Sequence, residues 1–209
     1  MQTPSLMVSM NQLSNHDHSR FLTRTNQIVG RIGSVGADKA NEGIRKYVLR
    51  EAVLIQMTWP GAPTLYYGDE AGVCGWTDPD SRRTYPWGQE DYELIEFHRY
   101  MITLHRALPA LRRGSLKQLL EGRNLIAYGR MRGINKCAVA LNSGDETCQI
   151  KLPVWELGIA DGQIMTQLML TNKDGYNAGM KPYEVKDGKI TLELPGGSGV
   201  LLSIGGRLR

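Results

Sequence analysis

Apolar residues recur with a helical period in the first half of the chain and with a period of two in the second half. Ile44, Val48, Ala52 and Ile55 follow one another at spacings of four, four and three residues, which places them on one helical face. The pattern predicts a helix over residues 37–58, because prolines and a glycine come directly after it and proline cannot continue a helix. A short apolar run over residues 64–67 then predicts a buried strand.

A second amphipathic helix is predicted over residues 91–108, ended by Pro109. Its apolar stripe consists of Leu94, Phe97, Met101, Leu104 and Leu108. His98 and His105 lie on the same helix, where we expect ordinary surface residues. Helix, turn and short buried strand form the repeating unit of an α/β barrel. The first half is therefore predicted to be barrel-like.

From Leu116 onward, apolar and polar residues alternate in short runs. Strands are predicted over residues 139–141, 148–152, 165–170, 190–194 and 200–204, with turn signals rich in Gly, Asn, Asp and Pro between them. Short alternating strands separated by regular turns indicate an antiparallel sandwich. The boundary is predicted near residues 112–116, which gives one domain over residues 1–113 and a second over residues 114–209.

Composition narrows the functional classes. The chain has 209 residues, of which 41% are hydrophobic and 22% charged, and its net charge is +4. The basic residues are spread along the chain, which disfavours nucleic-acid binding, and no apolar run reaches the roughly 18 residues of a membrane span. The three cysteines lack the spacing of a metal site and do not suggest a disulfide framework, so we expect a reducing, cytoplasmic location.

Two clusters carry candidate chemistry. The first is Asn15-His16-Asp17 with Arg20, which follows an apolar stretch over residues 6–10. At the carboxyl end of a barrel strand, an amide, an imidazole and a carboxylate would face the shared site. Taken alone, the cluster is a weak signal, because Asn and Asp are common in turns. The second cluster runs from Gly61 to Glu70 and continues into a loop over residues 71–89, a length that usually indicates function.

The two clusters together resemble the α-amylase superfamily. Asn-His-Asp at residues 15–17 is similar to that superfamily's motif at the seventh barrel strand, and Gly-Ala-Pro-Thr-Leu-Tyr-Tyr-Gly-Asp-Glu at 61–70 to its motif at the eighth. Asp-Pro-Asp-Ser-Arg-Arg at 78–83, followed by Trp87, resembles the neopullulanase, cyclomaltodextrinase and maltogenic amylase branch. The resemblance implies an α/β plus all-β fold: the C-terminal portion of a TIM (β/α)8 barrel, with its seventh and eighth strand units, followed by an antiparallel β-sandwich domain.

The resemblance also implies roles for individual residues. Asp17 matches the carboxylate that stabilises the oxocarbenium-like transition state, and His16 matches the histidine that contacts the same sugar. Asn15 departs slightly from the pattern and is assigned only a supporting role. Asp78 and Arg82 match residues that bind glucose units on the non-reducing side of the cleaved bond.

For the other residues of the two clusters, a structural role is expected in place of a functional one or as an alternative to it. Arg20 is read as a structural brace for its loop. The carboxylates of Asp69 and Glu70 are expected to be structural at the barrel rim. Tyr66 and Tyr67 are expected to pack in the barrel. Trp87 either stacks on a sugar or pins the loop.

The nucleophile and the general acid of a retaining glycosidase lie, in this family, upstream of the Asn-His-Asp motif. We therefore expect a fragment that is inactive alone and needs the missing barrel portion or self-association. The predicted function is retaining hydrolysis of an α-glucan oligosaccharide such as a maltodextrin, cyclodextrin or pullulan-type substrate. A glucosyltransferase or isomerase of the same superfamily and a non-catalytic carbohydrate-binding homologue stay open as alternatives. No cofactor is expected, because the metal-binding residues of some relatives are not seen here.

Overall fold

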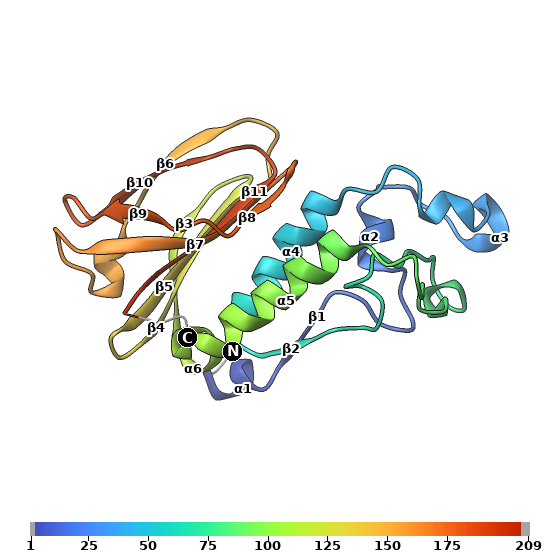
Figure 1. Cartoon of the computed structure of the whole chain (residues 1–209), viewed down its shortest axis with the longest axis horizontal. Coiled ribbons are helices and arrows are strands. Elements are labelled where there is room, and N and C mark those ends of the chain that lie inside the picture. The colour runs from blue at the N-terminus through green and yellow to red at the C-terminus, as the bar shows by residue number, and fades with distance from the viewer. Residues whose placement is uncertain (1–2, 206–209) are drawn as a thin grey trace.

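The computed structural model describes residues 3–205 (Figure 1). Its first half contains α1 (Thr3–Met7), β1 (Met10–Gln12), α2 (Phe21–Arg24), α3 (Ile32–Val35), η1 (Asp38–Ala40), α4 (Lys46–Thr58), β2 (Ala62–Thr64), η2 (Asp80–Arg82), α5 (Tyr92–Ala107) and α6 (Pro109–Arg113). Figure 1 shows α4 and α5 lying side by side between a large sheet and the β1–β2 pair. Within residues 3–205, no helix is both long and apolar enough to cross a membrane.

The two short strands of the first half are neighbours and run parallel. Met10 of β1 lies opposite Ala62 of β2, and Gln12 lies opposite Thr64. The prediction of a strand over residues 64–67 is wrong in its limits, because β2 covers Ala62–Thr64. These are the three residues that pair with β1. With α4 between them in sequence, the two strands form one parallel crossover unit.

Helix α4 differs from the sequence prediction at its start and in its buried face. It begins at Lys46, because residues 38–40 form the separate turn η1 and Gly43 has a φ of 66°, which a helix cannot include. The most buried apolar side chains of α4 are Leu49, Val53, Leu54 and Met57. Of the predicted stripe, Val48, Ala52 and Ile55 lie instead on the partly exposed side, and Ile44 precedes the helix. α5 and the sheet cover the opposite side.

Helix α5 confirms its predicted limits and stripe. Asp91 accepts a hydrogen bond from the Leu94 backbone N–H at 3.3 Å and so caps the helix. All five stripe residues are fully buried.

The two histidines of α5 were wrongly expected on the surface. His98 is buried, and its Nδ1 lies 2.7 Å from the Leu94 carbonyl oxygen. His105 is partly buried, with Nδ1 2.7 Å from the carbonyl oxygen of Met57 in α4. Both histidines face packed neighbours, because α5 is covered on more than one side.

The second half is antiparallel, and all the predicted strands are present. Its strands are β3 (Ser115–Glu121), β4 (Leu125–Arg132), β5 (Asn135–Asn142), β6 (Cys148–Leu152), β7 (Ile164–Asn172), β8 (Gly175–Asn177), β9 (Lys181–Glu184), β10 (Ile190–Leu194) and β11 (Ser198–Ile204). The large sheet has the order β3-β4-β5-β11-β7-β8, with β9 also paired to β7, and β6 pairs with β10. A second apolar cluster lies between the two sheets.

The two halves share an apolar core. One cluster of buried side chains includes Leu54 and Phe97 from the helices and Val139, Met169 and Leu201 from the large sheet. The division into residues 1–113 and 114–209 therefore stays a prediction about chain organisation.

A buried arginine links the helices to the sheet. Arg50 of α4 donates from Nε to Thr171 Oγ1 at 3.0 Å and from Nη2 to the Asn172 carbonyl at 2.8 Å. Its Nη1 donates to both carboxylate oxygens of Glu93 in α5, at 3.0 and 3.1 Å. The guanidinium joins three elements, and its hydrogen-bonding groups are matched by these partners.

We expect Arg50→Met to lower the free energy of unfolding by about 2–4 kcal/mol, because Thr171, Glu93 and a carbonyl lose their charged donor. Chemical denaturation measures the change. Arg99→Met is the matched control, since Arg99 pairs with Glu96 on the exposed side of α5, and such pairs contribute below about 1 kcal/mol. Equal effects of the two substitutions would contradict the prediction.

The carboxyl group of Glu51 in α4 gives stability a pH dependence. Burial raises its pKa from 4.5 to about 8, against a smaller opposing effect of the Lys173 charge. The folded state then binds more protons than the unfolded state between these values, so the free energy of unfolding falls as the pH rises from about 4.5 to about 8. Glu51→Gln should remove this decline and gain most over the parent chain above pH 8. Thermal unfolding at a series of pH values checks this, and identical pH profiles would refute it.

Candidate functional site

The Asn15-His16-Asp17 cluster lies in the loop that follows β1. The Asn15 side-chain oxygen accepts hydrogen bonds from the backbone N–H groups of Asp17 at 2.9 Å and His18 at 3.0 Å, an Asx turn. The turn leaves the side chains of His16 and Asp17 57% and 67% exposed, with His16 Nε2 3.3 Å from Asp17 Oδ1. Asn15 thus shapes the loop, and its two neighbours present polar groups to solvent.

The second predicted pair, Asp78 and Arg82, lies in the loop after β2. The two side chains form an ion pair and are each half-exposed. The pKa of Arg82 is raised, chiefly by its hydrogen bond to Asp78 and further by the charges of Asp78, Tyr66 and Asp17. Asp17 therefore lies within electrostatic reach of Arg82, although the two are far apart in sequence.

A hydrogen bond between the loops brings the clusters together. Ser81 Oγ donates to the His16 carbonyl oxygen at 2.8 Å, so η2 is attached directly to the Asn-His-Asp loop. The structure thereby gathers Asn15, His16 and Asp17 with Asp78 and Arg82 at one rim.

Arg20 connects the same two loops on their buried side. Its guanidinium is fully buried. It donates to the Ser81 carbonyl at 2.8 Å, to the Tyr67 carbonyl at 2.5 Å and to Asp69 Oδ1 at 3.0 Å. The cation also lies over the rings of Tyr66 and Tyr67, 4.0 and 4.7 Å from their centroids. Arg20 therefore acts as a brace.

The carboxylate of Asp69 lies on the buried side of this brace. Asp69 is buried and accepts from Arg20. Burial raises the pKa of Asp69, and hydrogen bonds from Ser14 and Arg20 oppose the rise. A carboxylate held by these contacts has a structural role, which is to stabilise the two loops.

Three residues that the sequence did not single out shape the loop bearing Asp78. Arg83 donates to both carboxylate oxygens of Asp80, at 3.0 and 2.8 Å. Asp80 also accepts from the Trp76 backbone N–H at 2.7 Å, and Trp76 Nε1 donates to the Gly36 carbonyl at 3.0 Å. The two Asp and two Arg residues within 78–83 were the available signal, but the sequence did not separate the exposed pair from the more buried one.

Trp87 lies at the outer end of the same loop. Its side chain is 82% exposed, and its ring centroid lies 4.5 Å from that of Tyr85. Exposure of this degree leaves one face of the indole available to a ligand.

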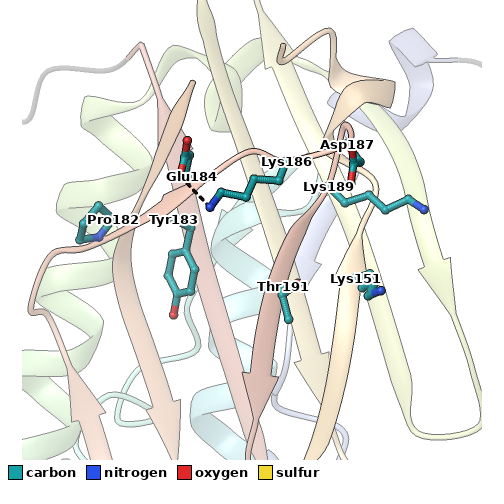
Figure 2. Close-up of a pocket in the computed structure, with 8 residues that line it drawn as sticks. All are labelled: Lys151, Pro182, Tyr183, Glu184, Lys186, Asp187, Lys189 and Thr191. Carbon is teal, nitrogen blue, oxygen red and sulfur yellow. Dashed lines mark ion pairs between the residues drawn. The ribbon is translucent and has the colours of Figure 1, made fainter. Parts of the chain in front are cut away.

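A separate hollow of about 440 Å³ lies in the second half of the chain. Figure 2 shows it between β9, β10 and β6, with Lys186 reaching toward Glu184 at 3.1 Å. Its lining includes Lys151, Tyr183 and Lys189. None of the predicted site residues borders this hollow, so it is distinct from the rim after β1 and β2.

Comparison with known proteins places these features in context. Residues 1–110 match the family described as alpha amylase, catalytic domain. The amylopullulanase of Thermoanaerobacterium saccharolyticum is 32% identical over 213 residues, which cover 95% of this chain and 16% of that protein. Neopullulanase 2 of Thermoactinomyces vulgaris is 36% identical over 152 residues, which cover 71% of this chain and 23% of that protein.

Solved structures extend the match. An Anoxybacillus α-amylase superposes with a TM-score of 0.74 at 25% identity, covering 95% of this chain and 38% of that structure. The chain spans only 11 to 16% of the length of the amylopullulanases that it matches.

We expect Arg20→Ala to lower the free energy of unfolding by about 3–5 kcal/mol, because it leaves Asp69 buried without its cation. Arg82→Ala removes an exposed guanidinium and should leave stability close to that of the parent chain. Urea denaturation of the two variants measures both values. A stability loss for Arg82→Ala as large as that for Arg20→Ala would disprove the division between brace and rim.

Proposed function

The chain belongs to the alpha-amylase catalytic-domain family, and on this premise we propose that it supplies the sugar-binding and transition-state-stabilising side chains of a retaining α-glucan hydrolase. Family membership confirms the resemblance predicted from residues 15–17 and 61–70. The match to solved amylase structures confirms the predicted fold class, with part of the barrel followed by a mostly antiparallel sheet domain. The hydrogen bond from Ser81 to the His16 carbonyl oxygen, which joins the loop bearing Asp17 to the loop bearing Asp78 and Arg82, carries the functional proposal.

Asp17 is assigned to the transition state. Retaining glycosidases pass through an oxocarbenium-like state, and hydrogen bonds to sugar hydroxyls that strengthen in this state contribute several kcal/mol, roughly. A carboxylate held by the Asn15 turn and exposed to solvent suits this role, because its position is set before the sugar arrives. His16 lies next to it and binds the same sugar ring.

Asp78 and Arg82 are assigned to glucose units farther toward the non-reducing end. Together they offer acceptors and donors to hydroxyl groups, and each neutralises the other when no sugar is bound. Their half-exposed ion pair opens at little cost, since water competes for exposed pairs and leaves them contributing little to stability.

We assign neither the nucleophile nor the general acid to a residue of this chain. These two carboxylates must lie about 5–5.5 Å apart in a retaining enzyme, and Asp69 is already engaged by Arg20. The proposal is therefore that other parts of the barrel supply them, either from a longer polypeptide or from an associated copy. By itself, the chain would bind sugar without cleaving it.

The substrate is proposed from the relatives. Their names, amylopullulanase, neopullulanase and cyclomaltodextrinase, indicate enzymes of α-glucans. Such a substrate presents successive glucose units, which suits a rim where one cluster follows another.

We expect maltotriose to bind the chain and Asp17→Asn to weaken that binding about tenfold or more, since a hydrogen bond to a charged group contributes about 1.5–3 kcal/mol. Arg82→Ala should act in the same direction. Asp145→Asn is the control, because Asp145 is an exposed carboxylate of the β5–β6 turn. NMR titration measures the affinities. Unchanged affinity in Asp17→Asn would remove Asp17 from the sugar site.

A further inference from the structure

Two aromatic side chains form an exposed pair at the outer end of the loop after β2. The ring centroids of Tyr85 and Trp87 lie 4.5 Å apart, with the ring planes inclined at 48°. Trp87 is 82% exposed, whereas Trp76 in the same loop is 2% exposed. Trp76 holds the loop in place through its hydrogen bond to the Gly36 carbonyl oxygen. Trp87, in contrast, contributes little to the packing of the loop.

A tight turn fixes the backbone beneath this pair. The Trp87 N–H donates to the Tyr85 carbonyl oxygen at 3.0 Å. The Gln89 N–H donates to the Pro86 carbonyl oxygen at 2.8 Å. Gly88 has a φ of 79°, a left-handed conformation that glycine adopts without strain. The two rings are thus held in place before a ligand arrives, so that less conformational freedom is lost on binding.

Hydrogen bonds tie both ends of the segment that contains this turn. Before the turn, Tyr67 Oη donates to the Arg83 carbonyl oxygen at 2.8 Å. After the turn, the Asp91 N–H donates to the Ala71 carbonyl oxygen at 3.1 Å. Residues 84–90 therefore begin and end at fixed points of the loop. Figure 1 shows the loop between β2 and α5 at the end of the molecule opposite the large sheet.

The aromatic pair lies near the ion pair of Asp78 and Arg82. Trp87 follows Arg82 by five residues. A chain advances at most about 3.6 Å per residue, so the two Cα atoms are at most about 18 Å apart. The turn at Tyr85 and Trp87 shortens this distance further. A glucan chain bound at Arg82 therefore needs only a few more glucose units to reach Trp87.

The residue types of this segment match a sugar better than a protein partner. A pyranose ring has apolar C–H faces and hydroxyl groups around its edge, and a flat indole covers such a face through dispersion and burial of apolar area. Beside the two aromatic residues, residues 84–89 contain Thr, Pro, Gly and Gln, and no Val, Leu, Ile or Met. The patch is therefore narrow for the apolar centre of a protein interface.

We propose that Tyr85 and Trp87 form a stacking platform for a glucose unit beyond those bound by Asp78 and Arg82. The apolar face of this glucose unit lies on the indole of Trp87, and the ring of Tyr85 supports the indole. The inference rests on the proposed function and deepens it, because it makes the preferred ligand an α-glucan longer than maltotriose.

The test compares maltotriose with maltohexaose. Isothermal titration of the full chain with each sugar measures the two affinities. Maltohexaose offers several overlapping trisaccharides, which raises its affinity for every variant alike, so each variant is compared with the parent chain for the same sugar. We expect Trp87→Ala to weaken the binding of maltohexaose about tenfold and to leave the binding of maltotriose unchanged.

Two further variants separate stacking from other effects of the substitution. Trp87→Phe keeps a flat apolar ring and should retain most of the affinity for maltohexaose. Trp155→Ala removes an indole that is 58% exposed on η3 (Val154–Leu157) in the second half of the chain, and it should change neither affinity. Thermal unfolding confirms that each variant is folded.

An unchanged affinity of the Trp87→Ala variant for maltohexaose would overturn the platform. Equal weakening of both sugars would also overturn it, because Trp87 would then contact the units that maltotriose occupies. In either case Asp17→Asn would still weaken maltotriose binding, so failure of this inference is distinguishable from failure of the proposed function. Absence of binding of both sugars to the parent chain would overturn the two together.

Discussion

The buried guanidinium of Arg20 fixes the geometry on which the proposed sugar site depends. Its three acceptors come from positions 47, 49 and 61 residues away in the sequence, and two tyrosine rings cover its face. A desolvated cation is stable only while these partners stay in place. The loops after β1 and β2 are thus held together beneath the rim. The exposed side chains above them then need little reorganisation to meet a ligand.

The same type of ion pair serves two purposes at two depths. Arg20 and Asp69 are buried and hold the backbone of both loops, whereas Arg82 and Asp78 are half-exposed. Water competes for the outer pair and weakens it, which suits the proposed replacement of one partner by sugar hydroxyls. Asp80 and Arg83 form a third pair, nearer to the buried extreme, and keep the loop in shape between the other two.

Helix α4 is the structural centre of the chain because it has neighbours on most sides. It packs against α5 and the large sheet, and Gln56 donates to backbone carbonyls of both short strands, those of Asn11 and Thr64. The face left over carries Val48, Ala52 and Ile55, which are partly exposed. A helix with apolar residues around most of its surface has no single apolar stripe from which its most buried face can be predicted. The periodicity over residues 44–55 therefore predicted the helix, but it predicted the least covered side as the buried one.

The sequence alone determined the features that depend on local pattern. The alternation in the second half predicted the strands, the stripe from Leu94 to Leu108 predicted α5, and the two motifs predicted the family. Tertiary structure decided the rest: the burial of His98, the late start of α4, the brace at Arg20 and the roles of Asp80 and Arg83. The physical reason is that periodicity reports only how residues of one segment face one another. Burial and hydrogen bonding are set by partners tens of residues away, which only the folded chain brings into contact.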